Sequence, residues 1–444
     1  MATLDSSIVN VALPSLKKYM NTDLRSIKWI VVLYLLTITC SLLPLGRLSD
    51  LYGRKKFFQY GFLVFSLGSL MCGLSQSVTH LVISRILKGF GAAMLMANGP
   101  AIITQRFPLK ERGRAIGILS MVASIGLVSG PTLGGALITF FGWRSIFLVN
   151  VPLGLMGFYL ARLHLPIAIR EKVSKPFDVL GAMTQALILL VVIFIVDPPS
   201  MMVAGTMIDV SRTWLIIAFL CLMVLFVYIE KRVSDPVLDF SLFKIRNFVV
   251  GNISNFCMFF AYSSLLVLMP FYLEESLHLD PEHSGYLMSL IPFSIFIVAP
   301  LSGYFADRYG TQGPMLLGAL LSTAVFTVMS GLYTKGLLQE SKSSDIGWCL
   351  LLVGAALGIF QSPTNVTVMS SVPTIKSGVA SAFLAAVRNL GFVAGTGVSA
   401  QIFVWRLRVS GSSIEAFHAP LVLAGVFSAL AVVAAVFTEP FSDS

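Results

Sequence analysis

The sequence carries very little charge for its length. Only 12% of its 444 residues are Asp, Glu, Lys or Arg, whereas soluble domains carry about 25%. Such a chain has too few charges to cover a soluble surface. One helix needs about 20 apolar residues to cross about 30 Å of hydrocarbon, and 56% of this chain is hydrophobic. The composition therefore predicts a bundle of membrane helices with no room for a large soluble domain.

Cysteine and histidine are also scarce, with five of each. The cysteines fall inside or at the ends of apolar segments and form no CxxC pair, so we interpret them as buried thiols. The histidines scatter near the ends of apolar runs and form no ligand cluster. The sequence also shows no nucleophile paired with a base and no phosphate-binding loop. It therefore predicts no metal site, no cofactor and no enzyme activity.

The net charge of +10 needs another explanation than nucleic acid, because no single dense basic face is present. The Lys and Arg residues lie instead in short connections between apolar runs, which are too long for barrel strands and are therefore helices. Fourteen spans are predicted near residues 1–16, 28–48, 57–77, 80–105, 114–139, 144–164, 177–197, 212–231, 247–273, 283–305, 314–334, 346–370, 377–404 and 419–437.

Positive charge gathers in the connections after the even-numbered spans, which predicts that these connections and both termini are cytoplasmic. Lys17, Lys18, Arg25 and Lys28 run against this trend after the first span. No basic region precedes the first apolar stretch, so no cleavable signal peptide is expected. Asp5 lies unusually close to the start for a crossing helix, which indicates either a shortened first helix or a chain start assigned too late.

An internal repeat divides the chain. The segment Gly46–Gly53 (GRLSDLYG) recurs as Gly303–Gly310 (GYFADRYG), and Gly126–Gly130 (GLVSG) recurs as Gly391–Gly395 (GFVAG) at nearly the same offset. Related parallel halves are a transporter architecture, with a substrate site near the midplane between them. We expect a six-helix half at residues 1–164, two inserted helices at 165–246 and a second six-helix half at 247–444.

Ionisable residues well inside spans are candidates for function, because a charge in hydrocarbon costs at least about 2.5 kcal/mol. Asp5, Arg85 and Arg388 are such residues. Arg388, three residues before the Gly391 run, has either a structural or a functional role, and the structural role is the more common one. Asp5 either faces a cavity or lies at the membrane surface. Arg85 either pairs with Asp5 or binds backbone carbonyls and anchors its helix. Lys88, one turn beyond Arg85, either faces the cavity or reaches the membrane surface.

Two glycine-rich segments are further candidates. Gly126, Gly130, Pro131, Gly134 and Gly135 place small residues one turn apart beside a proline, which permits close helix packing and a bend. This group serves either tight packing alone or a pivot that seals the extracellular side.

The connection from Gly46 to Lys56 combines glycines for a tight turn with basic residues for topology. Topology alone does not require Asp50, so we interpret this aspartate as part of a gate, with a passive helix cap as the alternative. The candidate latch group comprises Gly46, Asp50, Gly53, Arg54 and the repeat-related Asp307.

Polar residues within apolar runs bond neighbouring helices or line a cavity. The candidate cavity-lining residues are Asn10, Asn98, Gln361, Asn365 and Arg388.

Four motifs in order resemble those of the major facilitator superfamily, and specifically its fourteen-span drug:proton antiporter branch. They are the first-helix segment Leu4–Pro14, the loop Gly46–Lys56, Arg85 with Gly89 and Gly91, and the helix 5 segment Gly126–Gly135. The resemblance covers essentially the whole chain. One departure is Lys88, which stands where the family commonly has glutamine.

The resemblance implies alternating access, with Asp5 and Arg85 in proton or cation coupling, Asp50 in a conformational latch and the helix 5 glycines in an export geometry. The expected function is proton-coupled efflux of lipophilic or cationic small molecules across a cell membrane. Its partners are the substrate, protons and the lipid bilayer. A transporter of one specific metabolite, a transport-derived sensor and an inactive fragment remain alternatives.

Overall fold

The computed structural model describes residues 1–106, 122, 125–126, 129–165, 178–196, 200–203, 206–209, 211–233, 240–334, 343–373 and 377–438. Within helices, the side chains of Asp50 and Asp307 lie outside this description. The helices are α1 (Ala2–Tyr19), α2 (Leu24–Ile27), α3 (Trp29–Tyr52), α4 (Arg54–Gly73), α5 (Val78–Arg106), α7 (Ser145–Leu148), α8 (Asn150–His164), α9 (Val179–Val196), α10 (Arg212–Glu230), α11 (Arg246–Phe271), α12 (Pro281–Tyr309), α13 (Gln312–Thr334), α15 (Ser343–Ser370), α16 (Ser377–Ser410) and α17 (Ser413–Val436).

In the part of the chain that the structure describes, helices occupy the predicted spans other than 114–139. Residues 129–141 are also helical, whereas most of the predicted span 114–139 before them lies outside the described residues. Among the described residues, nine helices are long and apolar enough to cross a membrane. The fold is thus an all-helical bundle of membrane-spanning type, and the count of fourteen spans stays a prediction.

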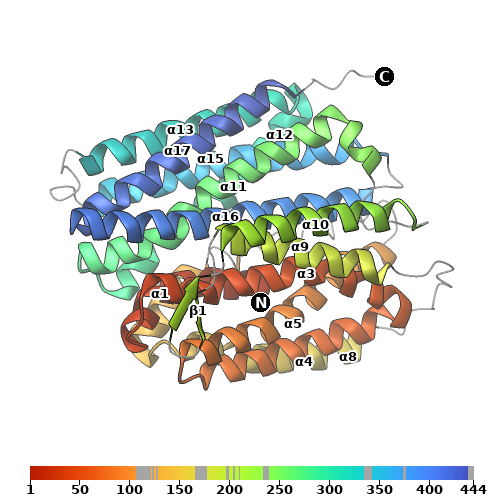
Figure 1. The fold of residues 1–444 in the computed structure, drawn as a ribbon, viewed down its shortest axis with the longest axis horizontal. Coiled ribbons are helices and arrows are strands. Elements are labelled where there is room, and N and C mark those ends of the chain that lie inside the picture. Colours follow the sequence, from red (N-terminus) through yellow and green to blue (C-terminus); the bar gives the residue numbers. More distant parts are fainter. Residues whose placement is uncertain are drawn as a thin grey trace.

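The helices form two groups with α9 and α10 beside the seam between them. Figure 1 shows α1 to α8 on one side of the bundle and α11 to α17 on the other. Helix α9 contacts both α3 of the first group and α16 of the second. The insertion of two helices between two halves, with the boundaries 1–164, 165–246 and 247–444, stays a prediction.

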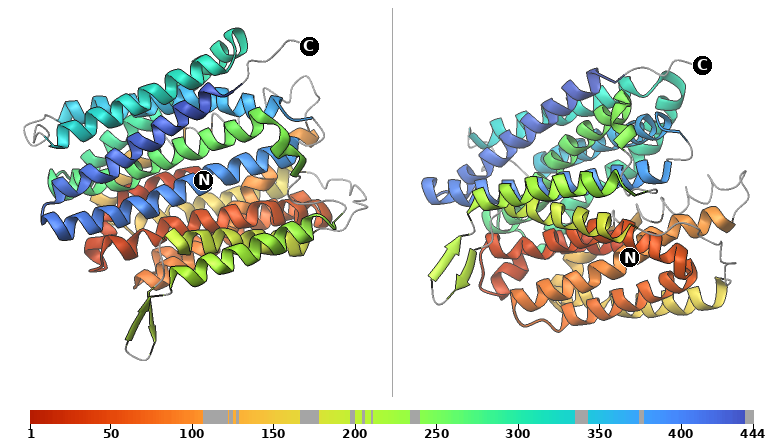
Figure 2. Two further views of the ribbon diagram at one scale, coloured as in Figure 1. Left: turned by 45° about the horizontal axis from the view of Figure 1, so that its top comes forward. Right: turned by 45° about the vertical axis from the view of Figure 1, so that its right-hand side comes forward.

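A short hairpin joins the two inserted helices. Strand β1 (Ser200–Val203) pairs antiparallel with β2 (Thr206–Asp209), with Ser200 opposite Asp209 and Val203 opposite Thr206. Figure 2 shows this hairpin projecting from one end of the bundle.

The two halves repeat the same local geometry. Gly53 ends α3 at φ 105° and Gly310 ends α12 at φ 88°, a region that favours glycine. Gly46 and Gly303 begin the repeated segment in α3 and α12. A β-carbon on Gly46 would contact Ala97 of α5, and one on Gly303 would contact Ser362 of α15. Corresponding glycines therefore pack against corresponding helices, as the sequence repeat predicts.

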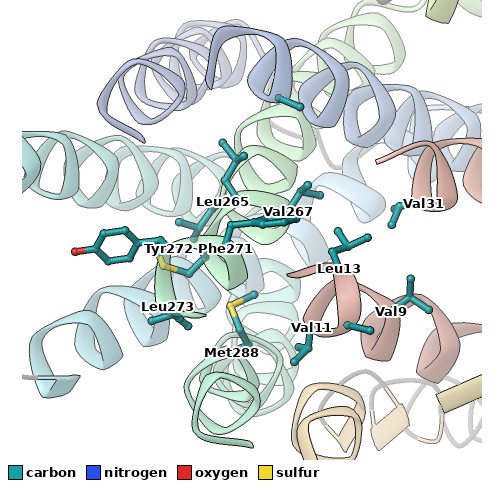
Figure 3. Close-up of a cluster of buried hydrophobic side chains, with 14 of the residues drawn as sticks. Val9, Val11, Leu13, Val31, Leu265, Val267, Phe271, Tyr272, Leu273 and Met288 are labelled. Carbon is teal, nitrogen blue, oxygen red and sulfur yellow. The ribbon is translucent and has the colours of Figure 1, made fainter. Parts of the chain in front are cut away.

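Two hydrophobic clusters join the halves, a small one with Val32 and Leu36 of α3, Leu189 of α9 and Val393 of α16 and a large one at the Phe271 end of α11. The large one combines apolar residues of α1 and the start of α3 with residues of α11, α12, α15, α16 and α17. Figure 3 shows Val9, Val11 and Leu13 of α1 near Val267 and Phe271 of α11. Separate cores form within one half alone, one around Phe65 of α4 and another around Phe248 of α11. The large cluster surrounds the C-terminal ends of α1 and α11, so the described halves are packed together there.

Candidate functional site: a buried charge cluster and a seam between the halves

Asp5 lies at the centre of a buried charge cluster. Its carboxylate accepts hydrogen bonds and forms ion pairs with Arg85 and Lys88, and all three residues are fully buried. Arg85 and Lys88 are three residues apart on α5, which places both cations on one face of that helix. Asp5 is thus enclosed by side chains of the N-terminal half.

Arg85 has both of the roles that the sequence left open. Besides pairing with Asp5, it donates from Nε to the carbonyl oxygen of Ile30 in α3 at 3.1 Å. Its guanidinium also lies 3.7 Å from the centre of the Tyr34 ring, which is favourable for a cation over an aromatic face. Arg85 therefore ties α1, α3 and α5 together through one side chain.

The Lys88 side chain is fully buried between aromatic rings. Its Nζ lies 4.7 Å from the Phe65 ring centre and 5.2 Å from that of Phe147. Asn150 completes the surroundings by donating from Nδ2 to Asp5 Oδ1 at 3.4 Å and to the Ile146 carbonyl at 3.1 Å. One carboxylate thus faces two cations in a site sealed from solvent.

The glycines of segment 126–135 pack against α1, the helix that carries Asp5. A β-carbon on Gly126 would lie 3.0 Å from Thr3 Oγ1, and one on Gly130 would lie 2.7 Å from Ser7 Oγ. Gly134 faces Ile8 in the same way. Small residues along this face let the two helices approach closely.

The same segment also contacts the other half. A β-carbon on Gly135 would meet the backbone of Pro281 and Glu282 at the start of α12, and one on Gly285 of α12 would meet the backbone of Pro131. The segment therefore lies between α1 and the C-terminal half, a position compatible with either tight packing or a pivot.

An ion pair crosses between the halves at the C-terminal end of α1, here called the Lys17 end of the bundle. Lys17 Nζ lies 2.7 Å from Glu275 Oε1 and 5.6 Å from the Phe271 ring centre. Glu275 belongs to a π-helical turn, Tyr272–Ser276, that follows α11. This pair explains one of the basic residues that run against the charge trend, because Lys17 serves a contact between halves.

The structure describes only some of the side chains of the predicted latch. Gly46 and Gly53 lie on or after α3 as expected, and Arg54 begins α4. Lys55 Nζ donates to the Arg162 carbonyl at 3.1 Å. The side chains of Asp50 and Asp307 lie outside the described residues, so the latch stays a prediction.

The candidate cavity-lining residues separate into two groups. Asn10 and Asn98 are buried in the N-terminal half, and Asn98 donates to the Met94 carbonyl of its own helix at 2.8 Å. Gln361, Asn365 and Arg388 are partly exposed in the C-terminal half. The structure thus brings Asp5 and Arg85 together but places Arg388 on the other side of the seam.

Sequence reasoning missed two members of these sites, Asn150 and Glu275, and left Lys88 between two roles. The spacing of Lys88 from Arg85 indicates a shared face, but it does not show which way that face points. Asn150 lies in an apolar run as several other amides do, and its position in the sequence does not point to Asp5. Glu275 gave no signal of its own, because its partner Lys17 lies 258 residues earlier in the chain.

Comparison with known proteins identifies the class. The chain matches the profile described as Major Facilitator Superfamily over residues 1–396 and 252–443. The chain belongs to this superfamily of transporters, which are not enzymes. It is a multi-pass membrane protein that acts in transmembrane transport of small molecules.

Individual relatives have diverse names. The chain is 34% identical over 409 residues to the riboflavin transporter RibZ of Clostridioides difficile (strain 630), covering 92% of this chain and 86% of that protein. It is 31% identical to the multidrug resistance protein Stp of Mycobacterium tuberculosis (strain CDC 1551 / Oshkosh), covering 90% and 73%. It is 28% identical to the tetracenomycin C resistance and export protein of Streptomyces glaucescens, covering 92% and 74%.

Solved structures show the same fold. A bacterial homologue of the human lysosomal transporter Spinster, in an inward-facing and unoccupied conformation, matches with a TM-score of 0.68 at 14% identity, covering 100% of this chain and 96% of that one. The D-xylose-proton symporter also matches with a TM-score of 0.68 at 14% identity, covering 97% and 95%.

Proposed function

We propose that this protein is a proton-coupled exporter of lipophilic small molecules, of the fourteen-span drug:proton antiporter type, in the cell membrane. The observation that carries the proposal is the buried cluster in which Asp5 pairs with both Arg85 and Lys88. An embedded carboxylate paired with cations is typical of proton relays in transporters.

Protonation of Asp5 would remove its negative charge and both of its ion pairs. Two buried cations would then face each other without a counterion, which is costly in a medium of low dielectric constant. Relief requires α1 and α5 to shift, and Arg85 would carry α3 with it through the Ile30 carbonyl. Protonation is thereby coupled to the positions of three helices.

Helix α1 connects this site to the contacts between the halves. Its Thr3 and Ser7 face the glycines of segment 126–135, and its Lys17 pairs with Glu275 of the C-terminal half. A shift of α1 would therefore act on the seam as well as on the charge cluster. In this proposal the Lys17 end faces outside and is closed, both termini are cytoplasmic, and Asp50 and Asp307 belong to latches at the opposite end.

The names of the relatives support export of small molecules, since they include a multidrug resistance protein and an export protein. The riboflavin transporter among them favours a second candidate, a transporter of one specific metabolite. A broad or a narrow substrate profile distinguishes these two.

Inside-out vesicles with an acidic lumen provide the test. Riboflavin, tetracenomycin C and ethidium are added in turn, and lumenal pH is followed with a trapped dye. We expect at least one compound to be taken up with release of lumenal protons, and Asp5→Asn to abolish this release. Asp23→Asn is the matched control, because Asp23 is exposed and its capping bond to Ser26 N can be kept by asparagine. Uptake that continues unchanged without a proton gradient would refute proton coupling.

A further inference from the structure

Arg388 is a cation inside a span that has no counterion in the described part of the chain. It belongs to the apolar stretch Phe383–Ser410 of α16, and its side chain is partly exposed. Among the described residues, the structure shows no hydrogen bond or ion pair to Arg388. Its guanidinium instead lies 5.9 Å from the Phe259 ring centre in α11.

Three aromatic side chains form a row that begins beside this guanidinium. Phe259 and Tyr262 are one turn apart on α11, and their ring centres are 6.3 Å apart. Tyr262 in turn lies 6.4 Å from Phe392, which is one turn from Arg388 on α16. We call Arg388, Phe259, Tyr262 and Phe392 the aromatic ladder. Tyr262 and Phe392 are partly exposed, and the Tyr262 hydroxyl has no hydrogen-bond partner among the described residues.

The aromatic ladder lies next to the seam between the halves. Asn389, the neighbour of Arg388, donates from Nδ2 to Thr39 Oγ1 of α3 at 2.9 Å. Exposure of an arginine to lipid inside a span costs at least about 2.5 kcal/mol, so such residues face the bundle interior or a cavity. Because Asn389 beside it contacts α3, we expect the partly exposed face of Arg388 to lie toward the seam between the halves.

The charges inside the spans restrict what can bind here. The sequence places one acid, Asp5, and three bases, Arg85, Lys88 and Arg388, well inside the apolar runs. The acid already accepts from two of the bases. A cationic substrate would therefore meet uncompensated positive charge at Arg388, because no described carboxylate pairs with that guanidinium.

We propose that the aromatic ladder binds planar aromatic molecules that carry a negative charge or a hydrogen-bond-accepting edge. The rings would receive the aromatic plane, Arg388 would donate to the anionic edge, and the Tyr262 hydroxyl would supply a second donor. This inference rests on the proposed transport function and narrows it, because the sequence alone also allowed cationic substrates.

The test uses binding and not transport, so that it stands apart from proton coupling. The purified full chain in nanodiscs is titrated against fluorescein, an anion at neutral pH, and against rhodamine 123, a cation on the same xanthene core. Fluorescence polarisation reports both. We expect fluorescein to bind about ten- to a hundredfold more tightly, the range for one hydrogen bond to a charged group.

Variants localise the effect. Arg388→Gln should weaken fluorescein binding by about tenfold or more without weakening rhodamine 123, Arg388→Lys should restore part of it, and Arg388→Glu should reverse the preference. Arg406→Gln is the matched control, because Arg406 is exposed on the same helix, with its guanidinium 5.2 Å from Trp405. Thermal unfolding of each variant shows that it is folded.

Tighter binding of rhodamine 123 by the wild type would overturn the proposal, and so would the absence of fluorescein binding. Equal weakening of both dyes by Arg388→Gln would also overturn it. Failure of proton-linked transport with the fluorescein preference intact would leave this site standing and refute only the proposed coupling.

Discussion

The two halves of the molecule hold buried charge in different ways. In the N-terminal half, Asp5, Arg85 and Lys88 are fully buried and paired with one another. In the C-terminal half, Arg388 is partly exposed, and among the described residues its guanidinium interacts with the Phe259 ring and with no acid. A sealed charge cluster is suited to store a protonation state, whereas an accessible cation is suited to meet a ligand. The two related halves can thus divide proton coupling and substrate recognition between them.

The largest difference in stability is expected between substitutions of Arg85 in the N-terminal half and Arg388 in the C-terminal half. Arg85→Gln leaves the buried cluster incomplete and breaks the bond to the Ile30 carbonyl, so we expect a loss of about 3 to 5 kcal/mol in the free energy of unfolding. Arg388→Gln removes no described ion pair, and we expect a change within about 0.5 kcal/mol. Thermal unfolding of both variants in the same detergent provides the comparison, and equal losses would contradict the difference between the halves.

A second comparison uses two glycines related by the internal repeat. A β-carbon on Gly391 would lie 2.5 Å from the Phe256 carbonyl oxygen, a backbone atom that cannot easily move, whereas one on Gly126 would lie 3.0 Å from the Thr3 hydroxyl. We expect Gly391→Ala to cost about 1 to 3 kcal/mol through overpacking. Gly126→Ala should be close to neutral, since alanine favours the helix by about 1 kcal/mol. Unfolding midpoints measure both, and a larger loss for Gly126→Ala would show that the packing at α1 is the tighter one.

The smallest effect is expected where the halves meet at the Lys17 end. The pair between Lys17 and Glu275 is partly exposed, and such pairs contribute about 0 to 1 kcal/mol. A double-mutant cycle with Lys17→Gln and Glu275→Gln should give a coupling energy in that range that decreases at high salt. Lys18→Gln is the control, because Lys18 is exposed on the next position of the same helix. A coupling well above 1 kcal/mol would make this pair a main lock between the halves.

The sequence predicted the helices because long apolar runs have few alternatives in lipid. It also predicted the repeat, since Gly53 and Gly310 are both needed at positive φ where two helices end. Asp5 and Arg85 could be selected because charges inside spans are costly.

The contacts of these residues could not be predicted in the same way. The burial of Lys88 depends on the rotation of α5 against Phe65 and Phe147, which a single helix does not determine. The pairing of Lys17 with Glu275 depends on how two distant halves meet. The accessibility of Arg388 depends on α11 as well as on its own helix.

If coupling lies in the N-terminal half and recognition in the C-terminal half, substitutions in the two halves have separate effects. Fluorescein binding and substrate-driven proton flux are measured on the same preparations of Asp5→Asn and Arg388→Gln in proteoliposomes. We expect Asp5→Asn to lose proton flux while its fluorescein affinity stays within about twofold of wild type, as for independent sites, and Arg388→Gln to lose fluorescein binding. Loss of fluorescein binding in Asp5→Asn to the same extent as in Arg388→Gln would refute the division of coupling and recognition between the halves.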